Sequence, residues 1–534
     1  MGLFNCLPEL PVSYPVALGV IYLIWCIWEG IYRLWFHPIA KFPGPKIAGL
    51  TYWYEMYYDI YLGGQYGNRI KAMHDQYGPI IRISPAELHV SDPSFYQPLY
   101  APSPTPTSPP LSQKRHKWSR YVRLTGLDQQ SGFATVPHDL HRLRRQPLEP
   151  FFSPANVRKL QGLIVSKVDH LCRRLVEQQE KIEDEGVRIK LAFTCFTTDV
   201  VTEYAFGKSF DYLAHPDFFP EWSDMLRDIG KTVPLLKAWP WLLLILDSIP
   251  LWLAKRMGTG LEAAVITKIE GRKQILALKA ASQKEDQNGE LASEKDSHEK
   301  SHRTIFEEVL KSDLPEYEKS VSRLEGDAQA ILNAGSETTA SVLGVTTCHI
   351  LLNPSIHTRL RDAVRSLAPA STPSVIPSLQ DLERCPYLVA VVKEGLRLSY
   401  GLTTRLPRIA DVELEYEGWR IPAGTPVGMS AAMMHNDEGV WDRPGEFCPE
   451  RWEDPKEAAR LGRYLVSFSK GSRGCVGVNL AYAELYIALA ALFRRFDMRL
   501  DGVEKDDLKL VGDCFLPIFK KPNSEIKVFM EKAQ

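Results

Sequence analysis

One cysteine near the C-terminus, Cys475, lies in a pattern of residues that suits metal ligation. It belongs to the segment FSKGSRGCVG, residues 468–477, which reads F-x-x-G-x-R-x-C-x-G. Glycine backbone can wrap closely around a sulfur atom and donate N–H groups to it. The positive end of the helix expected from Val478 onward and the charge of Arg473 would both lower the pKa of the Cys475 thiol. The pattern therefore predicts that Cys475 is held as a thiolate, the form in which a cysteine binds a metal.

Taken alone, Cys475 would be interpreted as a small buried hydrophobic residue, as most free cysteines are. The chain has nine cysteines, an odd number without a C-x-x-C pair, at positions 6, 26, 172, 195, 348, 385, 448, 475 and 514. This spacing fits neither a disulfide framework nor a zinc cluster, and it favours a reducing, cytosol-facing domain.

A second segment could move protons. The helical pattern from Gly326 to Leu352 contains the sequence AGSETT, residues 334–339. Glycine and adjacent threonines are poor choices for a helix interior, and a threonine that bonds back to the preceding turn can bend the helix. An acid beside a hydroxyl, here Glu337 and Thr338, suits proton delivery. A chance Gly-Thr cluster on a buried helix is the alternative if this segment is taken alone.

Together the two segments resemble the motifs of the cytochrome P450 family. The loop resembles its haem-binding loop, which makes Cys475 the axial ligand of the haem iron, and A-G-x-E-T-T resembles its acid–alcohol pattern. The resemblance implies that Gly335 leaves room for dioxygen, Thr338 hydrogen-bonds the bound oxygen and Glu337 relays protons. It also implies haem b (iron protoporphyrin IX) as cofactor, contacted in the loop by Phe468, Gly471, Arg473 and Gly477.

Two further motifs support the resemblance. Glu394 and Arg397 form E-x-x-R, which in isolation would be a weak exposed helix pair. The later PERW segment, residues 449–452, resembles the P-E-R-F element of the family, with Trp452 in place of Phe. The resemblance implies a buried network of Glu394, Arg397 and Arg451 that supports the haem loop.

Basic residues occur at the places where the family binds the two haem propionates. His141 and Arg145 share one helix face at i,i+4 spacing, and Arg408 and Arg473 complete the implied set. Arg142 and Arg144 form either a solvated face or a basic surface for an electron donor, and the sequence does not separate these.

The N-terminus is apolar enough to cross a membrane. Residues 14–28 carry no charge, and 21 helical residues from Val16 to Phe36 would span about 30 Å, the thickness of a bilayer core. No basic segment precedes the apolar run, which argues against a cleaved signal peptide, and a surface helix is a third interpretation. Basic residues follow the run, so the positive-inside rule places the rest of the chain in the cytosol.

The expected domain organisation follows from these boundaries: a short flank over residues 1–13, a transmembrane anchor over 14–36, a Pro/Gly hinge over 37–46 and a catalytic domain over 47–534. The expected fold class is mainly α with small β-sheets, with strands concentrated before residue 95, including a hairpin over 80–90, and after residue 405.

The apolar stretch 238–253 is either core or an interfacial patch that dips into the membrane. Residues 283–303 are polar and predict a solvated linker.

The sequence thus predicts a single-pass membrane protein, resembling fungal family members near trichodiene oxygenase, that acts as a haem-thiolate monooxygenase in the endoplasmic reticulum. The net charge of −1 argues against a nucleic-acid partner. Because no G-x-G-x-x-G or P-loop pattern is present, electrons would come from an NADPH-cytochrome P450 reductase, with cytochrome b5 as a further candidate donor. The expected substrate is a lipophilic terpenoid or polyketide, contacted by residues 104–133, 331–335, 401–404 and 515–516. The alternatives are a haem-thiolate isomerase or dehydratase that does not use O2, and a non-enzymatic haem carrier.

Overall fold

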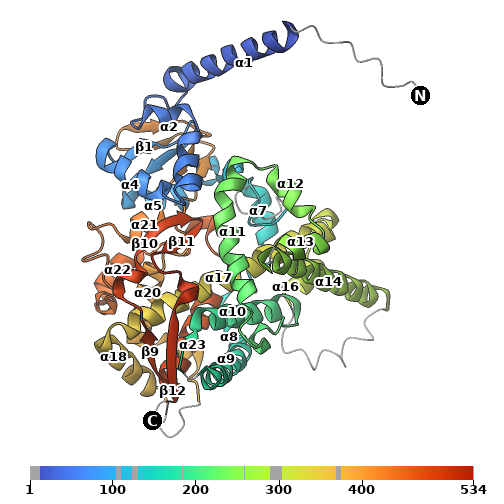
Figure 1. Cartoon of the computed structure of the whole chain (residues 1–534), viewed down its shortest axis with the longest axis vertical. Helices are drawn as coiled ribbons and strands as arrows, with labels where there is room; N and C mark the ends of the chain where they lie inside the picture. The colour runs from blue at the N-terminus through green and yellow to red at the C-terminus, as the bar shows by residue number, and fades with distance from the viewer. Residues whose placement is uncertain are drawn as a thin grey trace.

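The computed structural model describes residues 13–103, 110–122, 130–182, 184–257, 259–288, 304–368 and 375–532. Helices dominate, and one apolar helix projects from the body of the protein (Figure 1). This helix, α1 (Ser13–Ile31), continues as a π-helical turn over Tyr32–Phe36. Residues Tyr14–Phe36 are long and apolar enough to span a membrane, and none of the apolar window is buried inside the protein. The expected anchor boundaries therefore coincide with a real helix.

The expected hinge, residues 37–46, packs closely on the rest of the chain. Ile39 and Phe42 are buried, and the Phe42 ring stacks on Trp419 at a centroid distance of 4.9 Å. Gly44 has φ +147°, and a Cβ atom there would lie 2.4 Å from the carbonyl oxygen of Arg82. The Pro/Gly segment therefore fixes the base of the anchor against the first sheet.

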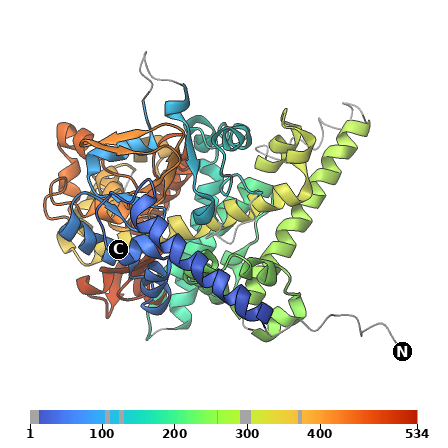
Figure 2. The same cartoon turned by 90° about the horizontal axis from the view of Figure 1, so that it is seen from above.

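The longest helix, α17 (Val321–Leu351), crosses the middle of the domain (Figure 1, Figure 2). It packs against α10 (Ile189–Phe206), which is buried almost throughout. Thr194, Thr198 and Thr202 of α10 can be buried because each hydroxyl donates to a carbonyl of the preceding turn. Helix α23 (Val478–Arg495) lies on the other side of the core and is also almost fully buried.

The remaining longer helices surround this core. They are α4 (Tyr66–Tyr77), α7 (His138–Arg145), α8 (Pro154–Lys159), α9 (Gln161–Lys181), α11 (Pro220–Ala238), α12 (Leu242–Asp247), α13 (Leu251–Met257), α14 (Thr259–Asn288), α16 (Ile305–Lys311), α18 (Pro354–Arg365), α20 (Pro386–Leu398) and α22 (Pro455–Gly462). Shorter helices are α2 (Lys46–Leu50), α3 (Trp53–Met56), α5 (Tyr96–Tyr100), α6 (Ser119–Val122), α19 (Leu379–Glu383) and α21 (Ala431–His435). Of the expected linker 283–303, the part up to Asn288 is helical, and 289–303 lie outside the described residues.

The strands form small sheets. Five pair in the order β1-β2-β8-β5-β3: β1 (Ile80–Arg82), β2 (Leu88–Val90), β8 (Pro426–Gly428), β5 (Arg408–Ala410) and β3 (Arg115–Lys117). The expected hairpin over 80–90 is confirmed as the antiparallel β1–β2 pair. The other sheets are β4-β12-β9 (Val187–Arg188, Lys527–Lys532, Phe496–Asp501), β10-β11 (Leu510–Cys514, Leu516–Phe519) and β6-β7 (Leu414–Tyr416, Trp419–Ile421). Strands β3 and β4 lie outside the two expected regions, because each is only two or three residues long and has no alternating pattern of its own.

The apolar stretch 238–253 is exposed rather than core. Trp241 is 55% exposed, Leu244 72% and Trp252 62%. These residues belong to or adjoin α12 and α13, and α12 lies toward the end of the molecule from which α1 projects (Figure 1). Of the two interpretations of this stretch, the exposure favours the interfacial patch.

Candidate active site

The cysteine loop is held in shape by its own backbone. The N–H of Cys475 donates to the carbonyl of Phe468 at 2.8 Å, and the N–H of Gly474 donates to the carbonyl of Gly471 at 2.9 Å. Gly471 has φ +70°, and a Cβ atom there would lie 2.1 Å from the carbonyl oxygen of Tyr100. Only glycine fits this position, for reasons of both backbone conformation and space.

The Cys475 side chain keeps exposed surface. Burial raises the pKa of its thiol, while the N–H of Gly477 and the charge of Arg145 act to lower it. The expectation that Arg473 lowers this pKa is wrong, because the Arg473 guanidinium points away from the sulfur. It donates to the carbonyls of Thr135 and Val136, both at 2.7 Å. Ionisation of the thiol therefore depends on a bound metal, which deprotonates a coordinating cysteine.

Helix α17 presents the expected hydroxyl on its cavity side. Thr338 Oγ1 donates to the carbonyl oxygen of Ala334 at 2.7 Å, which is the predicted bond back to the preceding turn. Ala334 is exposed and Thr338 half-buried, although both lie in a mostly buried helix. Residues four apart share a helix face, so Ala334 lies on the face of α17 from which Thr338 lines a cavity.

Gly335 lies at the contact between α17 and α10, and its expected role of leaving room for dioxygen stays a prediction. A Cβ atom at this position would lie 2.8 Å from Cγ2 of Val201 on α10, so the missing side chain makes room for helix packing. Beside it, Thr197 of α10 donates to the carbonyl of Ser336 at 2.6 Å and fixes the two helices together.

Glu337 is paired with Lys190, a residue that no sequence motif marks. Lys190 Nζ on α10 donates to both carboxylate oxygens of Glu337, at 2.5 and 2.7 Å, and to Ser223 Oγ at 3.1 Å. The side chains of Lys190 and Glu337 are only 3% and 12% exposed. The acid of the acid–alcohol pair is therefore a buried ion pair, and its partner is 147 residues away in the chain.

A cluster of buried cations lies beside the cysteine loop. Lys117 of β3 and Arg408 of β5 are directly opposite each other in the antiparallel pair, an arrangement that is destabilising for like charges. Arg473 is also buried, and none of the three forms an ion pair with a carboxylate among the described residues. Arg408 Nε is buried without a hydrogen-bond partner. Burial and the neighbouring cations lower the pKa of Lys117 well below its usual value and that of Arg473 to about 9.

These cations fit a group that carries two carboxylates, as haem does with its propionates. His141 joins the cluster: burial and the charges of Arg473 and Lys117 lower its pKa to about 2, so its imidazole is neutral. Arg145, in contrast, pairs with Glu149 at 2.9 Å and donates to the carbonyl of Gly474. The structure therefore brings together His141, Arg408 and Arg473, adds Lys117, and places Arg145 on the backbone of the cysteine loop.

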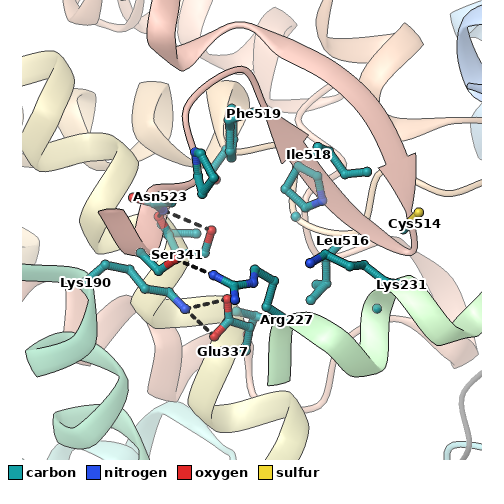
Figure 3. Close-up of a pocket in the computed structure, with 18 of the residues that line it drawn as sticks. Lys190, Arg227, Lys231, Glu337, Ser341, Cys514, Leu516, Ile518, Phe519 and Asn523 are labelled. Atoms are coloured by element: carbon teal, nitrogen blue, oxygen red, sulfur yellow. Dashed lines mark hydrogen bonds and ion pairs between the residues drawn. The ribbon is translucent and has the colours of Figure 1, made fainter. Parts of the chain in front are cut away.

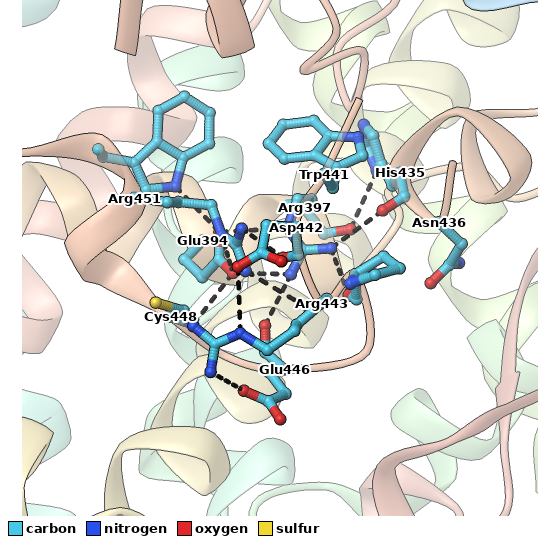
Figure 4. A network of polar contacts seen from close by, with 12 residues as sticks. Glu394, Arg397, His435, Asn436, Trp441, Asp442, Arg443, Glu446, Cys448 and Arg451 are labelled. Carbon is cyan, nitrogen blue, oxygen red and sulfur yellow. Dashed lines mark hydrogen bonds and ion pairs between the residues drawn. The ribbon is translucent and has the colours of Figure 1, made fainter. Parts of the chain in front are cut away.

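The expected network around Glu394 is present and fully buried at its centre (Figure 4). Glu394 accepts from Arg397 at 2.7 and 3.1 Å and from Arg451 at 3.1 Å. Trp452 adds a bond that phenylalanine could not make, because its indole N–H donates to Glu394 at 2.9 Å. His435 connects the network to the cysteine loop: its Nδ1 lies 2.9 Å from the carbonyl of Arg397, and its Nε2 accepts from the N–H of Val466 at 3.0 Å.

A cavity of about 300 Å³ adjoins Thr338 (Figure 3). Of the expected substrate-contact regions, Gly401 and Leu516 line it, while 104–109 and 123–129 lie outside the described residues. Residues of α11 that the sequence did not select, Arg227, Gly230 and Lys231, also line it. The amphipathic pattern of residues 220–238 is the one sequence feature that bears on these residues. It does not show which face of the helix lines a cavity.

Comparison with known proteins gives a consistent result. The chain matches the family model described as cytochrome P450 over residues 47–524. It is 39% identical over 529 residues to a cytochrome P450 monooxygenase of Ascocoryne sarcoides, a match that covers 98% of this chain and 99% of the relative. A tryptophan 6-hydroxylase of Fusarium equiseti is 39% identical over 536 residues, 99% of each chain. An N-acetyltryptophan 6-hydroxylase of Emericella nidulans is 38% identical over 533 residues, 98% of this chain and 99% of the relative.

Proposed function

The chain belongs to the cytochrome P450 family and is an oxygen-inserting monooxygenase with a haem-thiolate cofactor, and we propose that Cys475 supplies the thiolate. The relatives are named as monooxygenases and hydroxylases, which leaves the isomerase or dehydratase alternative without support. The observation that carries the proposal is the buried cluster of Lys117, Arg408 and Arg473, which has no acidic partner among the described residues and lies beside the loop that carries Cys475.

The cofactor in this proposal is haem b. Cys475 would ligate the iron, and Lys117, Arg408, Arg473 and His141 would bind the propionates through charge-assisted hydrogen bonds. When bound, the haem activates dioxygen and supplies the oxidant. Phe468, Gly471 and Gly477 shape the loop around the thiolate, and the Glu394–Arg397–Arg451 network holds that loop through His435.

Thr338 and Glu337 are the proton-delivering residues of the proposal. Thr338 and Glu337 are neighbours on α17 and both line the cavity. A carboxylate and a hydroxyl in sequence can hand on a proton without a change of the backbone. Lys190 is a positioning residue, because it binds both oxygens of Glu337 and fixes the orientation of the carboxylate.

We place the enzyme on the endoplasmic reticulum, with α1 as its single span and the catalytic domain in the cytosol. The exposed Trp241, Leu244 and Trp252 support a second contact with the same membrane. An NADPH-cytochrome P450 reductase in that membrane, with cytochrome b5 as a further candidate, would deliver the electrons.

The proposed substrate is a lipophilic secondary metabolite such as a terpenoid or polyketide. Two relatives are named for hydroxylation of tryptophan and N-acetyltryptophan. These names add an aromatic amino-acid derivative as a second candidate class.

The central claim is tested by the difference spectrum of the reduced protein with carbon monoxide. Wild-type protein should give the Soret maximum of a thiolate-ligated haem, and Cys475→Ala should lose it. Gly271→Ala, a change inside α14 where an added Cβ atom meets no neighbouring atom within 4 Å, is a control for handling. A wild-type protein that binds haem but shows an unshifted maximum would refute thiolate ligation.

A further inference from the structure

The cavity next to Thr338 has two different walls (Figure 3). One wall is apolar and consists of Val342 on α17 and Leu516 to Phe519 on β11. The opposite wall is polar and consists of Arg227, Ser341, Asn523 and Ser524. A cavity of this kind fits an amphipathic molecule, whose few polar atoms fix its orientation.

Arg227 reaches into the cavity from α11 (Figure 3). Its Nη1 donates to the neutral hydroxyl of Ser524 at 2.9 Å, and its Nε is buried without a hydrogen-bond partner. Its Nη2 lies 2.8 Å from Asp224, one turn earlier on the same helix. Its Nε also lies 3.8 Å from Asp228. Two acids of α11 thus flank the guanidinium, while its Nη1 meets a hydroxyl.

The charges that line the cavity favour an anion. Three cations line it, Lys190, Arg227 and Lys231, and two acids, Glu337 and Glu525, so the lining carries one net positive charge. The charge of Lys190 is compensated by Glu337. Asp224 and Asp228, which pair with Arg227 and Lys231, do not line the cavity. Their pairs are exposed by a third or more on each side, so they contribute little to neutralising the charge that the cavity meets.

Gly230 determines how closely the helix that carries Arg227 and Lys231 approaches the β10–β11 hairpin. A Cβ atom at position 230 would lie 3.1 Å from the carbonyl oxygen of Cys514 at the end of β10. Glycine therefore lets α11 approach the β10–β11 hairpin closely. Arg227 and Lys231, which are four residues apart, share the helix face that this approach turns toward the cavity.

From these contacts we propose that the substrate carries a carboxylate, bound by Arg227, while its apolar body lies against the β10–β11 hairpin and extends toward Thr338. The inference rests on the proposed monooxygenase function and adds the chemical class of the substrate. A carboxylate would replace the Ser524 hydroxyl as acceptor, because a planar guanidinium fork matches two carboxylate oxygens and gives stronger, charge-assisted bonds. Lys231 would add attraction at the end of the cavity.

The test compares acids with their primary amides, which have the same shape without the charge. A panel of arylalkanoic and fatty acids, each with its matched amide, is titrated calorimetrically into the haem-loaded full-length protein in detergent. Wild-type protein should bind at least one acid about 10-fold or more tightly than its amide, as expected for a charge-assisted bond. Arg227→Gln should abolish this preference, and Arg227→Lys should retain part of it because the charge remains without the fork.

Two variants serve as controls. Arg272→Gln removes an exposed cation of α14 that pairs with Glu325 and does not line the cavity, so it should leave the preference unchanged. Ser524→Ala removes only the neutral partner of Arg227 and should preserve the preference. A preference that survives Arg227→Gln, or that is lost equally in Ser524→Ala, overturns the proposal. So does a panel in which no acid binds better than its amide.

The spectrum with carbon monoxide, recorded on the same samples, separates this outcome from a failure of the proposed function. A thiolate spectrum without acid preference overturns only the carboxylate proposal. Acid preference without a thiolate spectrum supports the carboxylate site and refutes the haem-thiolate assignment.

Discussion

Replacing Lys190 by methionine would leave Glu337 as a buried carboxylate without its cation. The ammonium of Lys190 is the only cation within ion-pair distance of Glu337 among the described residues, and both side chains are almost fully buried. Methionine has a similar length and no charge, so the change removes the ion pair and little volume. It therefore isolates the electrostatic part of the contact between α10 and α17.

The expected loss of stability is large for a single substitution. Removing one partner of a buried ion pair costs about 3–5 kcal/mol, because the other charge stays desolvated. Unfolding entropy of about 2.1 cal/mol/K per residue amounts to about 1 kcal/mol/K for a domain the size of residues 47–534. The unfolding midpoint should therefore fall by about 3–5 °C.

The assay is thermal unfolding of the haem-loaded protein, followed by circular dichroism and by the thiolate spectrum. Glu337→Gln alone should cost a similar amount, since it leaves the ammonium unpaired. The double variant Lys190→Met/Glu337→Gln should recover most of the loss, with a coupling of about 2–4 kcal/mol between the sites. Lys167→Met is the matched control, because Lys167 pairs with Glu203 in a more exposed contact and should cost no more than about 1 kcal/mol.

Strictly additive effects of the two single substitutions would refute this reasoning. They would mean that Lys190 and Glu337 do not depend on each other for their stability. An equal loss in Lys167→Met would likewise show that burial of the pair is not what determines the cost.

Three further predictions concern packing and pH. Trp452→Phe should lower the free energy of unfolding by about 1–3 kcal/mol, because it removes the indole hydrogen bond to the charged Glu394. Urea unfolding measures this free energy, and an unchanged value would mean that the bond contributes nothing. Gly335→Ala should lower the free energy of unfolding by about 1–3 kcal/mol, because the added Cβ atom would contact Val201. Val201→Ala in the same chain should restore most of this loss. A double variant as unstable as Gly335→Ala alone would contradict the packing role. The pKa of Asp59 is raised by burial to about 7, so between about pH 4 and 7 the unfolded state loses a proton that the folded state keeps, and stability falls as pH rises. Asp59→Asn should therefore stabilise the protein by roughly 1–2 kcal/mol at pH 8 and less at pH 5, and an equal effect at both pH values in thermal unfolding would contradict this assignment.

Several features of the site follow from local sequence alone. The loop around Cys475 is predictable because its glycines and its hydrogen bonds lie within ten residues of one another. The bond from Thr338 to Ala334 and the pair of Glu394 and Arg397 are predictable for the same reason, since helical geometry brings residues three and four apart together. The anchor helix is predictable from the length of one apolar run.

Other features of the site depend on which helices and strands pack against each other, and local sequence does not predict this packing. Lys117 and Arg408 are ordinary basic residues until strand pairing places them opposite each other. Gly335 has the same local sequence whether it faces dioxygen or a neighbouring helix, and only the crossing of α10 over α17 shows that it faces Val201.

The family and the reaction class could be predicted from the amino-acid order, because they depend on short motifs whose geometry is local; the same motifs are the basis for proposing Cys475 as the iron ligand. The partner of Glu337, the buried cluster of Lys117, Arg408 and Arg473 and the place of Arg227 in the cavity lining emerge only from the folded chain. Those contacts join residues far apart in the chain, and burial together with helix and strand packing fixes their distances. Charge and hydrogen bonding at such contacts depend on the neighbours present, so the chemistry they provide appears only when the chain is folded.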